Sequence, residues 1–223
     1  MSHLKLLFLL VLVCSTARAW DISALDTARN VDYLTPAEKD VILEMNKARS
    51  DPGRYAEEYL KPRLQWFGGP FGNNAYLAPG ATVYTTTTEG RNGLQSCIDD
   101  LSRRPGVPPL MPMRGLSLAS RDHVMDTGPR GLTGHTGADG SSMNQRIERY
   151  GTWGVGAAEN IDYGHNTGRE IVIALLIDDG VPSRGHRTNI MDGAYRFVGT
   201  SIGSHRGYTY MCVTNYAGEY TNH

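Results

Sequence analysis

The sequence has few cysteines, no cluster of basic residues and only one long apolar run, and each absence excludes a class of protein. Three cysteines occur in 223 residues, far fewer than small disulfide-bonded domains contain. Lysine and arginine (22) nearly balance aspartate and glutamate (23), so we expect no nucleic-acid partner. Beyond residues 1–19 no apolar stretch is long enough to span a bilayer, and we expect no transmembrane segment after the leader is removed.

The start of the chain has the features of a secretory signal peptide. Residues 4–13 are apolar apart from Lys5, and residues 17–19 read Ala-Arg-Ala, the small-x-small pattern of a cleavage site. The apolar run is too short for a membrane-spanning helix. We therefore expect residues 1–19 to be cleaved and the mature protein, which begins near Trp20, to be extracellular.

The rest of the chain suits one domain of about 200 residues. Residues 20–34 show little periodicity and are expected to be an extended segment, and residues 35–220 are expected to form the domain. A capping box at residues 35–38, Thr-Pro-Ala-Glu, predicts the start of the first helix. Further helices are expected over residues 89–102, 116–127, 141–150, 169–178 and 182–191, and strands over 81–84, within 153–164, and over 197–202 and 208–213.

The order of these elements predicts the fold class. Helices and strands alternate without the regular spacing of parallel βαβ units. The last two strands are joined by a short Ser-His-Arg-Gly turn, which is typical of an antiparallel hairpin. Helices would then cover both faces of the sheet. We expect an α+β fold, a three-layer α-β-α sandwich with a central, mainly antiparallel sheet.

Two cysteines, Cys97 and Cys212, remain after leader cleavage. Cys97 falls on an apolar helical pattern and Cys212 within an expected strand. An exported protein can form a disulfide, and two buried free thiols fit the pattern equally well. Both alternatives stay open, and a catalytic thiol is the interpretation that these surroundings favour least.

Three short segments place titratable side chains among glycines or alanines. His135 lies in Gly-His-Thr-Gly, Glu159 follows two alanines, and His186 follows a glycine. An imidazole offers a neutral nitrogen to a metal or a proton, and a carboxylate behind it fixes its orientation. Asp178 and Asp179, just ahead of His186, can supply a second carboxylate. We predict that the fold brings these side chains into one cavity.

Each candidate also has a structural interpretation. His135 alone would be a surface loop histidine, and His186 alone would bond a carbonyl at a helix start. Ser183 precedes His186 without the pattern of a nucleophile elbow, and the absence of a His-Glu-x-x-His motif argues against a zincin-type protease. The remaining histidines of the mature chain are expected to be structural, in a helix, in turns or at the terminus: His123, His165, His205 and His223.

In these motifs the chain resembles the CAP superfamily, which comprises cysteine-rich secretory proteins, antigen 5 and pathogenesis-related protein 1, and above all its bacterial-type, SCP-like branch. The matching segments are residues 44–49 (Glu-Met-Asn-Lys-Ala-Arg), 134–135 (Gly-His), 159–161 (Glu-Asn-Ile) and 185–190 (Gly-His-Arg-Thr-Asn-Ile). The resemblance runs from about Thr35 to Tyr216 and implies an α-β-α sandwich with a central cleft.

The resemblance also implies a site. In that family two histidines and two acidic residues line the cleft, and the histidines can hold a divalent metal. By motif the histidines are His135 and His186 and the first acid is Glu159. The second acid of the family follows a tryptophan, and both residues are replaced here, so Asp178 or Asp179 takes its role with a shorter reach. Zinc matches imidazole ligands better than magnesium.

Family members are secreted and bind sterols, fatty acids or other partners. The resemblance therefore implies a secreted protein that binds a metal in its His/acid cleft and a lipid, a sterol or an extracellular protein. A metal-assisted, peptidase-like secreted hydrolase with Glu159 as its base is one alternative. A purely structural network of histidines and carboxylates is another. Because no credible nucleophile accompanies the candidate residues, binding is favoured over catalysis.

Overall fold

The computed structural model describes residues 19–223, so the predicted leader lies, apart from Ala19, outside the described residues. The helices are α1 (Ile22–Leu25), α2 (Pro36–Ser50), α3 (Pro52–Tyr55), the π-helical turn η1 (Ala56–Leu60), the 3₁₀ helix η2 (Lys61–Trp66), α4 (Gly90–Leu101), α5 (Arg114–Thr127), α6 (Met143–Glu148), α7 (Gly168–Ile177) and α8 (Gly185–Met191). The strands are β1 (Phe67–Gly69), β2 (Gly72–Tyr76), β3 (Thr85–Thr86), β4 (Met111–Pro112), β5 (Gly151–Tyr163), β6 (Phe197–His205) and β7 (Thr209–Asn222). Among these described residues, no helix combines the length and the apolar character that crossing a bilayer requires.

A four-stranded sheet in the order β4-β6-β7-β5 forms the centre of the protein. Strands β6 and β7 form the expected antiparallel hairpin, and β5 pairs antiparallel with β7 along most of its length. The two-residue strand β4 pairs parallel with β6. The sheet is therefore mainly antiparallel, as predicted, and β5 forms one of its edges.

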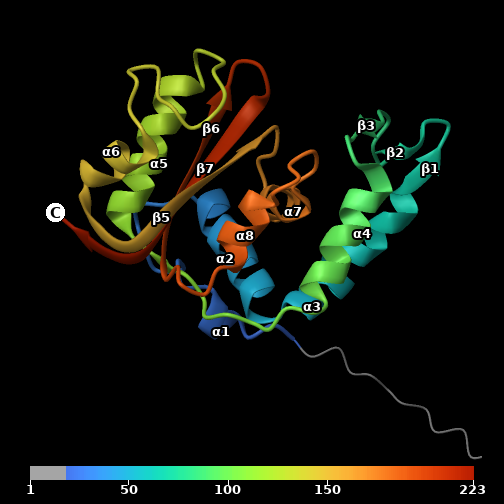
Figure 1. Cartoon of the computed structure of the whole chain (residues 1–223), viewed down its shortest axis with the longest axis horizontal. Helices are drawn as coiled ribbons and strands as arrows, with labels where there is room; N and C mark the ends of the chain where they lie inside the picture. Colours follow the sequence, from blue (N-terminus) through green and yellow to red (C-terminus); the bar gives the residue numbers. More distant parts are fainter. Residues whose placement is uncertain (1–18) are drawn as a thin grey trace, which may run out of the picture.

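Successive residues of β7 show that helices cover both faces of the sheet. Tyr216 belongs to the core cluster that contains Met45 of α2, whereas Ala217 packs with Leu116 of α5 and Ile147 of α6. Neighbouring residues of a strand point to opposite faces. Helices α2, α7 and α8 therefore lie on one face and α5 and α6 on the other (Figure 1). The predicted three-layer α-β-α sandwich is confirmed.

The segment from η1 to α4, residues 56–101, forms a side lobe next to the sandwich. Figure 1 shows α4 and the small sheet of β1, β2 and β3 apart from the central sheet, beyond α7 and α8. The single strand expected at residues 81–84 is wrong, because the strands lie on either side of that segment. Gly68, within β1, and Gly72, at the start of β2, adopt positive φ angles of 104° and 67°. Glycine adopts such angles without strain, so a hairpin forms here. Its sequence shows little hydrophobic periodicity and therefore does not predict these strands.

The segment expected to be extended, residues 20–34, contains the one-turn helix α1. The Asp21 carboxylate accepts a hydrogen bond from the backbone N of Ala24 at 3.3 Å, which caps this helix. An aspartate at a helix start stabilises the first turn, and a single turn is too short to show periodicity. The prediction of an extended segment is therefore wrong at α1.

Cys97 and Cys212 are both buried free thiols, so the disulfide alternative does not hold. The Cys97 thiol donates to the carbonyl oxygen of Leu176 at 3.2 Å, and the Cys212 sulfur lies 3.4 Å from the hydroxyl of Thr200. Burial raises the pKa of each thiol to about 12. Neither side chain is therefore a reactive thiolate at neutral pH.

Candidate functional site

The loop after α5 places His135 against Glu159 of the edge strand β5. Nδ1 of His135 lies 2.9 Å from Oε1 of Glu159. Nη2 of Arg146, on α6, donates to both oxygens of this carboxylate at 3.0 and 2.8 Å. The side chains of Arg146 and Glu159 are 2% and 1% exposed, so the ion pair is buried, whereas that of His135 is 56% exposed. No sequence pattern marks Arg146, since an arginine on a short helix carries no distinctive signal.

The environment of Glu159 decides what this pair can do. Both carboxylate oxygens already accept hydrogen bonds from Arg146, and one also meets His135. A general base needs an oxygen that can reach a substrate or a water. The geometry therefore gives Glu159 a role in orienting His135 through Nδ1, which leaves Nε2 of this exposed ring facing outward from the pair.

Asp178, and not Asp179, is the acidic partner of His186. Oδ1 of Asp178 lies 2.6 Å from Nδ1 of His186, and its Oδ2 accepts the backbone N–H of the same residue at 2.9 Å. Asp178 ends α7 in the left-handed conformation, with φ of 57°. The carboxylate of Asp179 instead accepts the backbone N–H groups of Thr88 and Glu89 at 2.6 and 2.8 Å, at the start of α4. The shorter aspartate reaches the imidazole because α8 folds back onto the end of α7.

The two histidine–carboxylate pairs lie on different sides of β5. Glu159 meets α6, whereas the side chain of its neighbour Asn160 donates to the carbonyl oxygen of His186 at 3.0 Å. Adjacent strand residues point to opposite faces. Within residues 19–223 no group of three or more histidine, cysteine, aspartate or glutamate side chains is arranged to hold a metal ion. The imidazoles match zinc in chemistry, but the described residues supply fewer ligands than protein zinc sites use.

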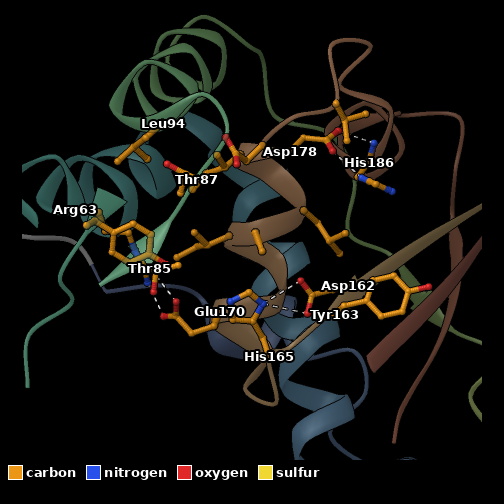
Figure 2. A pocket seen from close by; sticks show the side chains of 18 of the residues that line it. Arg63, Thr85, Thr87, Leu94, Asp162, Tyr163, His165, Glu170, Asp178 and His186 are labelled. Atoms are coloured by element: carbon orange, nitrogen blue, oxygen red, sulfur yellow. Dashed lines mark hydrogen bonds and ion pairs between the residues drawn. The ribbon is translucent and has the colours of Figure 1, made fainter. Parts of the chain in front are cut away.

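A cavity of about 380 Å³ lies beside the second pair, between α7, the end of β5 and the side lobe (Figure 2). Its apolar walls include Trp66, Phe67, Tyr76 and Leu94 of the side lobe and Ile173 and Ala174 of α7. Both His186 and Asp178 line it, whereas His135 and Glu159 are not among the described residues that do. This volume falls within the range of small-molecule binding sites.

The second imidazole of this cavity belongs to His165. Its Nδ1 lies 3.0 and 3.2 Å from the two oxygens of Asp162, at the end of β5. The hydrogen bond that Nδ1–H donates to this carboxylate raises the pKa of His165 above its usual 6.5, although burial opposes the shift. Figure 2 shows this pair on the other side of the cavity from the His186–Asp178 pair, next to Glu170. His165 lies in a turn, as predicted, but its role in the cavity was missed. The Asp-x-x-His spacing was the signal available in the sequence.

Comparison with known proteins assigns the family. The model of the cysteine-rich secretory protein family, CAP, matches residues 44–216. This span is more than half of the chain, and the protein belongs to the CAP family. The expected resemblance is thereby confirmed.

Two solved structures are similar to this chain. One is an outer surface protein from Borrelia burgdorferi, with 18% identity and a TM-score of 0.41 over 50% of this chain and 78% of that one. The other is an extracellular protein containing an SCP domain from Bacillus anthracis strain Ames, with 17% identity and a TM-score of 0.42 over 60% of this chain. The match covers 45% of the Bacillus chain. No curated protein matches the sequence.

Proposed function

We propose that this CAP-family protein is an exported binding protein that holds a small, largely apolar ligand, such as a lipid or a sterol, between α7 and the side lobe. The observation that carries the proposal is the cavity of about 380 Å³, with its aromatic and aliphatic walls and a few convergent polar groups. Ligand sites have this composition, in which apolar walls supply affinity and polar groups fix orientation. Export rests on the leader pattern of residues 1–19.

The polar groups of the cavity favour binding over catalysis. His165 and His186 both direct Nδ1 at an aspartate, and among the described residues neither ring bonds the hydroxyl of Thr85 or Thr87, which line the cavity. Covalent catalysis requires a nucleophile within reach of such a base. Glu159, the base of the hydrolase alternative, is held by Arg146 and belongs to the other pair.

Filling the cavity tests this function. Ala174, on α7, lines the cavity, so Ala174→Phe places a ring where the ligand would lie. Ala194 is exposed and provides the matched control, Ala194→Phe. We expect wild-type protein to increase the fluorescence of the neutral dye Nile red, and a lipid or a sterol to displace the dye. Ala174→Phe should weaken dye binding by about tenfold or more. A protein that binds no dye, or an Ala174→Phe variant that binds it like the control, contradicts the proposal.

A divalent ion at His135 and His186 is a second candidate function, and it requires the two rings to meet across the edge strand β5, because their carboxylates pack on opposite faces of the sheet. The supporting observation is that a carboxylate lies at Nδ1 of each ring, an arrangement that orients histidine ligands in metal sites. Titration of zinc into protein purified without chelator tests this candidate. The candidate requires that His135→Ala and His186→Ala each weaken zinc binding. If His165→Ala weakens it and His135→Ala does not, the pairing of His135 with His186 is wrong.

A further inference from the structure

The cavity carries more negative than positive charge. Its lining contains four carboxylates, those of Asp162, Glu170, Asp178 and Asp179, and one guanidinium, that of Arg63. While its imidazoles are neutral, this set has a formal excess of three negative charges. Asp162 and Asp178 are 6% and 3% exposed, so water screens their charges less than it screens charges on the surface. This arrangement disfavours an anionic head group and favours a cationic one.

The His165–Asp162 pair offers a ligand a hydrogen-bond acceptor with a negative charge behind it. Asp162 is only 6% exposed, and its carboxylate lies at Nδ1 of His165. A carboxylate in this place holds the proton of the neutral ring on Nδ1 and leaves the lone pair on Nε2. Nε2 of His165 has no hydrogen-bond partner among residues 19–223. The ring can therefore accept a bond from an N–H group in the cavity.

The charge of Asp162 is not neutralised by Arg63, because Arg63 pairs with Glu170. Arg63 bonds both oxygens of Glu170 at 2.8 and 2.5 Å, so these two charges compensate each other. Burial alone would raise the pKa of Glu170, but the hydrogen bonds from Arg63 outweigh it and lower the pKa. The rings of Trp66 and Tyr163 also line the cavity, and the guanidinium of Arg63 already lies over that of Trp66, 4.7 Å from its centroid, which leaves Tyr163, of these two, as the aromatic ring for a ligand. Aromatic faces attract cations and tolerate an apolar ligand equally well.

We propose that the ligand is a long-chain organic ammonium ion. Its N–H group donates to Nε2 of His165, and its apolar body lies along α7 and the side lobe. This inference rests on the proposed function, that the cavity holds an apolar ligand, and adds the charge of the head group. We propose an ammonium ion that is not attached to a larger molecule, because a cavity of about 380 Å³ has the size of a site for one small molecule.

Three ligands that share one chain and differ in head group test the proposal. Decylamine, decanol and decanoate are titrated calorimetrically into wild-type protein at about pH 9, well above the ordinary histidine pKa and still below that of an alkylammonium ion. We expect decylamine to bind about tenfold more tightly than decanol, because a hydrogen bond to a charged group is the stronger one. Decanoate should bind most weakly. If decanol or decanoate binds as tightly as decylamine, the ammonium proposal fails and the cavity function stands. If none of the three binds, the proposed function itself fails.

Two aspartate variants locate the head group. Asp162→Asn removes the charge behind His165 and should weaken decylamine binding about tenfold, with decanol binding changed by less than about twofold. Asp179→Asn removes an equal charge from the same cavity, but its oxygens face the backbone of Thr88 and Glu89. In this control the ratio of decylamine affinity to decanol affinity should stay within about threefold of the wild-type ratio. If both variants lose decylamine affinity equally, and thermal unfolding shows that both are folded, His165 is not the anchor.

Protons compete with the ammonium group for Nε2 of His165. Three charged groups face this ring: Asp162 from β5 and Glu170 from α7, which favour its protonation, and Arg63 from η2, which opposes it. Because the pKa of His165 is raised, the ring takes up a proton as the solution is acidified from about pH 9 to about pH 6. Decylamine affinity should therefore fall over this range while decanol affinity stays constant. A decylamine affinity that rises on acidification contradicts the proposal.

Discussion

At the scale of single residues, Arg49 joins segments that are far apart in the sequence. Its guanidinium is fully buried and donates to the carbonyl oxygens of Pro108, Ile190, Asp192 and Tyr195. Burial lowers the pKa of Arg49 to about 10, which keeps the group charged at neutral pH. Ile190 lies in α8, so Arg49 also holds the helix that carries the histidine of the second pair.

Arg49→Lys should destabilise the protein by about 3 kcal/mol or more, because an ammonium group cannot reach all four carbonyls and leaves buried acceptors without donors. Urea unfolding gives the free energy of unfolding for both proteins. Arg196→Lys is the control, since Arg196 is exposed, and it should change this free energy by less than about 0.5 kcal/mol. Equal effects of the two substitutions would contradict the role given to Arg49.

His123 makes stability depend on pH. Its Nε2 lies 2.8 Å from the carbonyl oxygen of Gly134, and its buried Nδ1 has no partner among the described residues. Burial lowers the pKa of His123 below its usual 6.5. Below about pH 6.5 the unfolded chain therefore binds a proton at His123 that the folded protein resists. The free energy of unfolding falls as the pH is lowered through this range.

Urea unfolding between about pH 8 and about pH 5 measures this effect. The loss of stability on acidification should be smaller in His123→Gln than in wild type, because the variant has no imidazole to protonate. His165 acts in the opposite direction, since its raised pKa adds stability that is lost as the pH rises through its folded value. If wild type and His123→Gln lose stability equally on acidification, His123 is not buried in the neutral form.

At the scale of elements, the start of α2 shows what local sequence can and cannot predict. The capping box is confirmed: Thr35 Oγ1 accepts from the backbone N of Glu38 at 3.3 Å, and Glu38 Oε2 accepts from the backbone N of Thr35 at 2.8 Å. Glu38 Oε1 also accepts the backbone N–H of Ile202 in β6 at 3.0 Å. That second bond joins helix to sheet across most of the chain, and no local pattern reveals it.

Thr35→Ala should therefore lower the free energy of unfolding by about 1 kcal/mol, the usual contribution of a helix N-cap. Glu38→Ala should lower the free energy of unfolding by about 2 kcal/mol, because it removes the cap and also leaves the partly buried N–H of Ile202 without its acceptor. Denaturant midpoints of the two variants test this order. A Glu38→Ala variant as stable as Thr35→Ala would show that the bond to β6 adds nothing.

The elements that the sequence predicted have strong local signals. Helices α2, α4, α5 and α7 carry apolar faces and boundary residues, and the β6–β7 hairpin has a clear turn. The short strands of the side lobe have neither apolar faces nor a clear turn. They consist largely of exposed glycines, asparagines and threonines, which show no alternation of apolar and polar residues. The choice between Asp178 and Asp179 depends on a left-handed backbone at the end of α7, and because either of two adjacent aspartates tolerates this conformation, the sequence does not show which one adopts it.

At the scale of the whole molecule, the cavity exists because the side lobe is fixed against α7 and α8. Arg63 of η2 bonds Glu170 of α7, and Glu89, just before α4, bonds Arg184, just before α8. Asp179 adds bonds to the backbone at the start of α4. These contacts join segments separated widely in sequence. A local motif therefore marks His186, whereas the cavity and the place of His165 in it depend on contacts between distant segments and are visible only in the tertiary structure.

The two thiols provide a global test of the folded state. Because Cys97 and Cys212 are buried and their pKa values are raised to about 12, neither should react with Ellman's reagent in the native protein that begins at Trp20. After unfolding in guanidinium chloride without reductant, two thiols per chain should react. A count of zero in the unfolded protein would show that the cysteines form a disulfide.

The central claim is that a small apolar ligand occupies the space between α7 and the side lobe. Nuclear Overhauser effects between the alkyl protons of bound decanol and the methyl groups of the protein test it directly. We predict contacts to Ile161, Ile173 and Leu175, which line the cavity. Contacts confined to exposed apolar side chains such as Val83, with none to these three residues, would contradict the account.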